Sequence, residues 1–283
     1  MPNNIAKYES SSGTIIELDT YDVSIGTATE LRGNYWGYDI DYRSISGVTR
    51  QANEITVDCY FSDPEQADLL RNVSDFDVYH KQPGKIWAGD WWQHAYITSS
   101  SVSKVFHDYH NESLTVVLLD GTWNKWHSEL FEQDTGSVSS EYLDLPTDAP
   151  FDLAISTTPL SLTNLATIES PVKITIYGYA INPYVIIGDN RYEVDVIIPE
   201  GSRLEIDGTT YPKTITMISS TGDRINCFGD GVRGTGTGSG EYVFEPLQPG
   251  YQSVIRSSSF LFEVEWLEQI GTPPWLSSSL VGD

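Results

Sequence analysis

The sequence predicts a mainly β protein with two domains. Its 283 residues are 12% aromatic and include 23 Gly and 14 Pro, a composition typical of short strands joined by turns. Apolar runs of strand length recur along most of the chain, and one segment alone has a clear helical pattern. A chain of this length forms one large domain or two ordinary ones, and we expect two.

The first half predicts a β-meander followed by one short helix. Apolar and polar residues alternate from Thr14 to Val57, with Gly residues between the runs. The segment 62–73 then provides side-chain acceptors for a helix N-cap, Pro64 at an early helical position, and apolar residues at 67, 70 and 73. Further strands at 84–97 and 112–119 complete a first domain that we place at residues 1–140.

The second half predicts a second β-domain at residues 151–275. Small polar residues at 133–140 precede Pro146 and Pro150, which indicates a connector at 141–150, and residues 276–283 form a tail. A chain reversal is expected at Asp207-Gly208. Strands are expected at 172–179, 182–188, 192–199, 202–206, 214–217, 242–244 and 260–266. So many short strands favour a sandwich or jelly-roll.

The chain is strongly acidic. Asp and Glu total 40 against 16 Lys and Arg, for a formal net charge of −24, which disfavours binding to a phosphate backbone. Two interpretations stay open: a solvated acidic surface, or acids that line a channel through which DNA slides without sticking. The sequence does not show which acids share a face.

Cysteine usage and the first residues indicate the compartment. Cys59 and Cys227 are far apart and lack zinc or redox spacing, so we expect buried, reduced thiols. The N-terminal residues show no apolar stretch after a basic start, and the longest aliphatic run is 116–119. We therefore expect neither a signal peptide nor membrane insertion.

The search for catalytic and metal motifs predicts none of either. His107 and His110 lack a third ligand at a recognisable spacing. Residues 229–234 formally match a dinucleotide fingerprint, but no helix pattern follows to bind a phosphate, so we expect a flexible loop. A Gly-x-Ser-x-Gly elbow is absent, and no acid stands in a distinctive motif. We expect no enzyme activity and no cofactor.

Tryptophans are the remaining candidate site residues. Trp87, Trp91 and Trp92 crowd the first domain, and large aromatics anchor cores and subunit interfaces or stack on sugars. We favour a core or partner-interface role for these three. Adjacent residues on a strand point to opposite faces, so Trp91 and Trp92 should too.

Several segments resemble one family in order and spacing. These are Ile176–Pro183, Pro199–Asp207, Asp223–Phe228, Pro246–Gly250 and Pro273–Trp275. Together they resemble the C-terminal half of the distal tail proteins of siphophages. The first half is similar more loosely, through the predicted helix and the stretch from Lys85 to Trp91.

The resemblance implies a structural virion protein at the tail tip or baseplate, made in the host cytoplasm. It implies an N-terminal tail-tube-like domain that closes a hexameric ring, and a galectin-like C-terminal β-sandwich. The hub would join the tail-tube protein to a tail-tip protein of the tail-associated lysin type and would contact a receptor-binding protein. DNA would pass through the lumen without specific binding.

The competing hypothesis is a carbohydrate-binding, lectin-like module for host adhesion. Galectin-like sandwiches often bind sugars on a face lined with Trp and Arg. The second domain has only Trp266 and Trp275, and its Arg residues show no sugar-binding pattern. A fold does not by itself confer lectin function.

Overall fold

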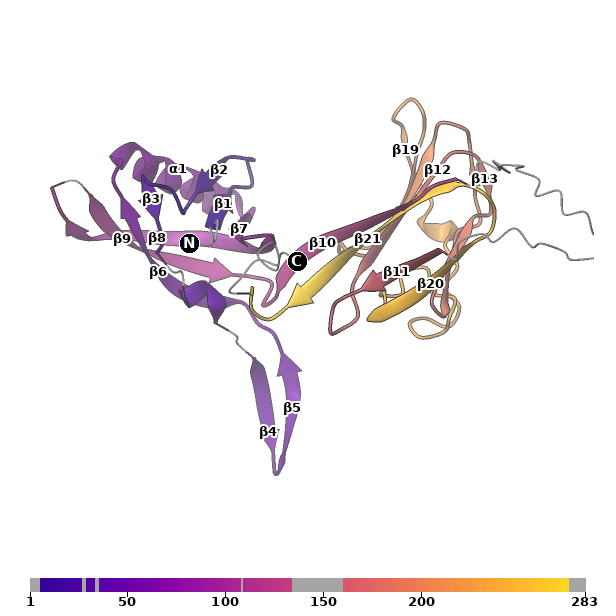
Figure 1. Cartoon of the computed structure of the whole chain (residues 1–283), viewed down its shortest axis with the longest axis horizontal. Coiled ribbons are helices and arrows are strands. Elements are labelled where there is room, and N and C mark those ends of the chain that lie inside the picture. Colours follow the sequence, from indigo (N-terminus) through magenta and orange to yellow (C-terminus); the bar gives the residue numbers. More distant parts are fainter. Residues whose placement is uncertain (1–5, 27–28, 34–35, 108, 134–159, 275–283) are drawn as a thin grey trace, which may run out of the picture. The chain divides into compact units, whose positions relative to one another are not determined.

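The computed structural model describes residues 6–26, 29–33, 36–107, 109–133 and 160–274 (Figure 1). It confirms the mainly β prediction with a single short helix. The chain divides into two compact units: unit 1 is residues 1–125 with 269–283, and unit 2 is residues 126–268. The connector expected at 141–150 and the tail at 276–283 lie outside the described residues.

Unit 1 is an antiparallel sheet covered by one helix. In sheet order, β6, β9, β8, β7, β1 and β2 are neighbours, and β3 pairs with the free side of β6. Its elements are β1 (Ala6–Glu9), β2 (Ile15–Glu17), β3 (Val23–Ser24), η1 (Thr29–Arg32), β4 (Gly37–Asp41), β5 (Ser44–Thr49), β6 (Asn53–Phe61), α1 (Pro64–His80), β7 (Gly84–Ala88), β8 (Trp91–Val105) and β9 (His110–Leu118). Strands β10 (Trp123–Phe131) and β21 (Leu261–Ile270) carry the chain into unit 2 and back.

The helix begins where the sequence predicts and continues further. The Asp63 carboxylate accepts from the Glu65 N–H at 2.9 Å, and Pro64 occupies the first turn. At the other end Lys81 adopts a left-handed conformation that stops the helix. The predicted apolar face at 67, 70 and 73 is buried against the sheet.

Unit 2 has two larger antiparallel sheets that share one apolar core, and β13 pairs with β16 in a third, two-stranded sheet. One sheet has the order β19-β18-β17-β12-β21, and the other has the order β11-β20-β14-β15. Buried residues from both sheets, among them Ile176, Val185, Val254 and Phe262, belong to one cluster. Its elements are β11 (Leu160–Asn164), β12 (Val172–Tyr177), β13 (Ala180–Ile181), β14 (Tyr184–Ile187), β15 (Asn190–Glu193), β16 (Ile197–Ile198), β17 (Arg203–Asp207), β18 (Thr214–Ile218), β19 (Arg224–Asn226), η2 (Phe228–Asp230) and β20 (Gly250–Arg256).

The strand predicted at residues 242–244 is wrong, and the one predicted at 192–199 is divided between β15 and β16. Residues 242–244 form a turn, although Val243 and Phe244 are buried as an apolar run requires. The Asn190 side chain explains the difference, because it bonds both the N–H of Tyr242 at 3.1 Å and its carbonyl at 3.0 Å. A side chain therefore provides the partners that a neighbouring strand would otherwise supply.

No helix among the described residues is long and apolar enough to cross a membrane.

Both cysteines are free and buried, as expected. Burial raises the pKa of the Cys59 thiol to about 12, with a contribution from Glu112, and burial also raises the pKa of Cys227. Because the thiolate is the reactive form, we predict that neither thiol of the native protein reacts with Ellman's reagent within minutes at pH 8. In denaturant both should react. Rapid labelling of the native protein would contradict this burial.

Candidate assembly interface

The hairpin formed by β4 and β5 exposes an apolar face. Pairing of Ile40 with Ile45 and of Asp39 with Ser46 assigns these residues to opposite faces. Tyr38, Ile40, Ile45 and Val48 share one face, and they are 55%, 75%, 63% and 52% exposed. The other face is polar and includes Asp39 and Asp41. A continuous exposed apolar face on a projecting hairpin indicates a protein contact.

The base of this hairpin is clamped by an arginine. The Arg50 guanidinium lies 4.0 Å from the centre of the Trp36 ring and donates to the Gly121 carbonyl at 3.2 Å. Partial burial lowers the pKa of Arg50. Figure 1 shows the hairpin projecting from the rest of unit 1. The clamp fixes the direction of the hairpin before any partner binds, which lowers the entropy cost of docking.

A second surface feature is an open strand edge on β8. Strand β7 pairs with one edge of β8 from Trp91 to Ala95, and β9 pairs with the opposite edge from Ala95 to Val105. Beyond Ala95, no strand in the described part of the chain pairs with the edge that β7 occupies earlier. Residues 98–105 are therefore available to pair with another strand.

A small pocket lies between this edge and the helix. Its volume is about 160 Å³, and apolar Leu70, Ile97 and Leu114 line it together with polar residues of α1 and β8. Its polar lining is Arg71, Ser74, Asp75, Thr98, Ser99 and Ser100. A pocket of this volume with three aliphatic lining residues suits a single apolar side chain.

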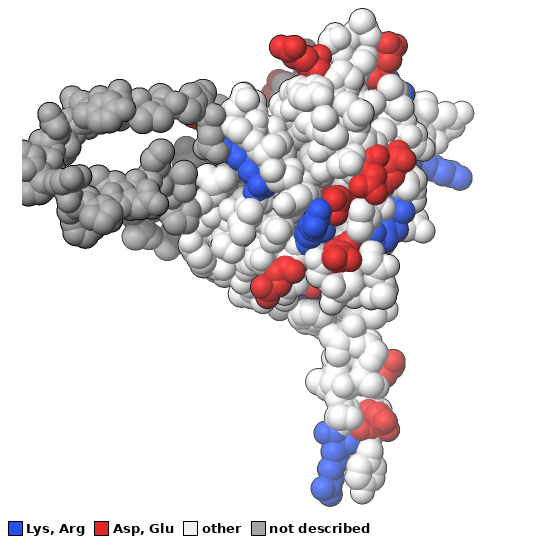
Figure 2. All heavy atoms as spheres, turned by 90° about the vertical axis from the view of Figure 1, so that its right-hand side faces the viewer, with Lys and Arg blue, Asp and Glu red and all other residues white. Residues whose placement is uncertain are grey.

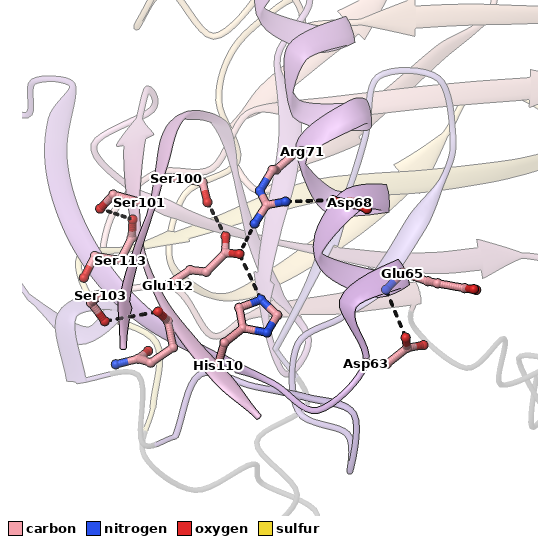
Figure 3. Close-up of polar contacts among 11 residues, drawn as sticks. Asp63, Glu65, Asp68, Arg71, Ser100, Ser101, Ser103, His110, Glu112 and Ser113 are labelled. Carbon is pink, nitrogen blue, oxygen red and sulfur yellow. Dashed lines mark hydrogen bonds and ion pairs between the residues drawn. The ribbon is translucent and has the colours of Figure 1, made fainter. Parts of the chain in front are cut away.

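A buried carboxylate links the helix to the strands beside the pocket (Figure 3). The Glu112 side chain is 1% exposed and accepts from Arg71 of α1, from Ser100 of β8, and from His110 at 3.0 Å. The His110 ring also stacks on Phe61 at 5.4 Å. Losing any one partner would leave the buried Glu112 carboxylate poorly compensated. The cluster therefore fixes the position of α1 relative to β8.

The structure places Trp87 and Trp92 together on one face of the sheet and Trp91 on the other. Trp91 packs against the core of unit 1, whereas its neighbour Trp92 lies on the opposite face of β8 beside Trp87, with ring centres 6.3 Å apart. The Trp92 ring is only 7% exposed, and Lys85 lies 4.9 Å from its centre. The partner-interface role of these residues stays a prediction.

Neither the exposed apolar face of the hairpin nor the open edge of β8 was predicted from the sequence. The alternation between 37 and 49 is part of the predicted meander, and the same pattern fits a buried strand and an exposed one.

The comparisons with known proteins identify the fold. No family model matches the chain, and no curated protein matches it. The chain matches the crystal structure of SPP1 Dit (gp 19.1) with a TM-score of 0.56 and 9% identity, over 94% of this chain and 98% of that one.

Two structures of the phage P2 baseplate also match. The structure of the activated baseplate with Ca matches with a TM-score of 0.54 and 9% identity. The structure of the activated baseplate with Sr matches with a TM-score of 0.53 and 8% identity. Each match covers 95% of this chain and 100% of the other.

The chain has the fold of phage baseplate hub proteins. The SPP1 protein is described as a paradigm of the hub adsorption apparatus in phages that infect Gram-positive bacteria. The hub fold extends over nearly the whole length of this chain, so both units are included in the likeness.

Proposed function

We propose that this chain is a structural virion protein, a distal tail protein that forms the hub of a siphophage tail tip. In this role it closes a hexameric ring, joins the tail tube to the tail-tip protein, and serves as an attachment point for a receptor-binding protein. Unit 1 is the tail-tube-like, ring-forming part, and unit 2 is the galectin-like part.

The observation that carries the proposal is the likeness over the whole length of the chain. A match that covers 94% of this chain and 98% of SPP1 Dit leaves little of either protein unmatched. An exposed apolar hairpin and an open strand edge on the same unit add a physical reason for self-association.

The acidic composition fits passage of DNA through such a ring. A net charge of −24 repels phosphates at close range, so DNA in the lumen would slide without binding. On the face that Figure 2 presents, acidic side chains are interspersed with basic ones and do not gather into one patch. The acids that would face the lumen must therefore be sought on other surfaces.

The proposal includes no catalytic step. Among the described residues, His110 forms one of several pairs between a histidine and a carboxylate, with Glu112 at 3.0 Å. The contacts of these two residues with Arg71, Ser100 and Phe61 give both of them a structural role.

A lectin-like adhesion role is the second candidate, and one cavity favours it. Unit 2 contains a cavity of about 710 Å³ whose lining includes Tyr179, Glu200 and Gln133. Tyr179 is 61% exposed, as a sugar-stacking ring would be. Trp266 is instead 5% exposed and stacked on His127, which removes it as a platform. A glycan array that stays blank with the full chain would end this candidate.

The hub proposal predicts rings. Negative-stain images of the purified chain should show particles with six-fold symmetry and a central hole, because a heterologous contact of suitable angle closes on itself. Sedimentation should give six times the monomer mass. Monomers that persist both alone and in the presence of the tail-tube protein of the same virion would contradict the proposal.

A further inference from the structure

We propose that the β4–β5 hairpin of one subunit adds a strand to the open edge of β8 in a second copy, with its apolar face beneath α1 of that copy. This inference rests on the proposed self-association and specifies the two surfaces that carry it. Both surfaces belong to unit 1 of the same chain.

The hairpin strands and the open edge of β8 both have backbone N–H and C=O groups that no other strand of the described chain pairs with. The hairpin strands have 5 and 6 residues, and each has one edge unpaired within the hairpin. The open edge at 98–105 has irregular pairing at Thr98 and Ser103, so the regular stretch 99–102 between them would pair with part of either hairpin strand. Main-chain pairing of this kind supplies affinity, while alternate side chains supply specificity.

The apolar faces match when the strands pair. Ile97 pairs with Val116 on the core side of β8, and Val102 pairs with Glu112, which also faces α1. Val102 is 53% exposed at this edge. A strand added here with Ile40 and Ile45 on the same side would continue the apolar surface toward the pocket of about 160 Å³.

The charges match on the opposite face. Lys104 pairs with Asn111, so its side chain lies on the side of the sheet away from α1. In the described part of the chain no carboxylate forms an ion pair with Lys104. The polar face of an added hairpin would place Asp39 and Asp41 on this same side.

The occupant is a second copy of this chain. The Arg50 clamp directs the hairpin away from the rest of unit 1 (Figure 1), so it does not cover the edge of its own β8. Each copy therefore offers its own hairpin and its own open edge of β8. A contact between two different surfaces of identical chains is heterologous, and its repetition gives a ring or a filament.

Complementation between two variants tests this arrangement. The double variant Ile40→Lys with Ile45→Lys disables the hairpin, and Val102→Lys disables the edge. All three positions are exposed, so we expect thermal unfolding close to that of the wild type. Sedimentation velocity should show rings for the wild type, monomers for each variant alone, and dimers for an equimolar mixture, because the mixture retains one intact contact per pair.

Reversing the charge of Lys104 is a second, independent test that does not involve Val102. Lys104→Glu should weaken association about tenfold, and adding Asp41→Lys should restore much of it. Tyr211→Lys in unit 2, at a position 99% exposed, is the matched control and should leave rings unchanged.

The outcomes separate the two proposals. Rings that persist in both variants, or a mixture that stays monomeric while the wild type forms rings, would overturn the docking and leave the hub function standing. A wild-type chain that stays monomeric at every concentration, both alone and in the presence of the tail-tube protein of the same virion, would count against both.

Discussion

Replacing Asp77 by Ala is expected to lower the free energy of unfolding by about 4 kcal/mol. The Asp77 carboxylate of α1 is fully buried and accepts from the Tyr8 hydroxyl at 2.7 Å, from the Ser10 hydroxyl at 2.8 Å and from the Ser11 N–H at 3.0 Å. Burial and the bond to Asp77 raise the pKa of the Tyr8 hydroxyl, which therefore remains a donor. Removing the acceptor leaves the buried hydroxyls of Tyr8 and Ser10 without this partner.

Urea unfolding followed by tryptophan fluorescence measures this effect, since Trp87, Trp91, Trp92 and Trp123 lie in unit 1. Asp75→Ala is the matched control on the same helix, at an exposed position, and should change stability by less than about 0.5 kcal/mol. Equal effects of the two substitutions would show that the buried network contributes nothing specific.

Phe262→Ala should destabilise unit 2 by about 4 kcal/mol. The Phe262 ring is 0% exposed, stacks on Phe131 with centres 4.6 Å apart, and meets Phe260 edge-on at 5.8 Å. Truncation leaves a cavity between two sheets that cannot collapse around it without breaking strand pairing.

Hydrogen exchange across β12 and β17 would report this loss directly. Exchange that occurs through global opening should accelerate about a thousandfold. Tyr211→Ala, at a position 99% exposed in the same unit, should leave exchange unchanged. Protection in β12 that survives Phe262→Ala would mean that the core is held mainly by its other residues.

The sequence predicted features that depend on neighbours along the chain. The helix start at Asp63 and Pro64 and the reversal after Asp207 both follow from local geometry, and the structure has both. The run 242–244 was predicted as a strand because burial and strand formation leave the same apolar signature. The structure shows that burial can occur in a turn when a distant side chain, that of Asn190, satisfies the backbone.

Features that depend on which edges meet could not be predicted in the same way. Whether β8 keeps a free edge past Ala95 depends on where β7 begins to pair and on the path of α1 above it. Likewise, the alternation around Ile40 is the same for a buried strand and for a projecting hairpin. For this reason the candidate tryptophans drew attention, whereas the exposed apolar face did not.

The discontinuity of unit 1 in sequence has a consequence for how the protein is made and how it can vary. Residues 126–268 interrupt unit 1, and the Arg32 guanidinium bonds the carbonyls of Pro273 at 3.0 Å and Pro274 at 2.6 Å after the chain returns. On the ribosome, unit 1 therefore cannot be completed until unit 2 has been synthesised in full.

The point at which the chain leaves unit 1 lies close to the point at which it returns. Just inside unit 1, the Gln269 amide donates to the Asn124 carbonyl oxygen at 3.0 Å, so the outgoing and returning strands lie side by side. Insertions at such closely spaced ends are readily exchanged or removed without disturbing the host domain. Unit 2 is therefore an insertion that can be exchanged between related proteins while unit 1 is kept.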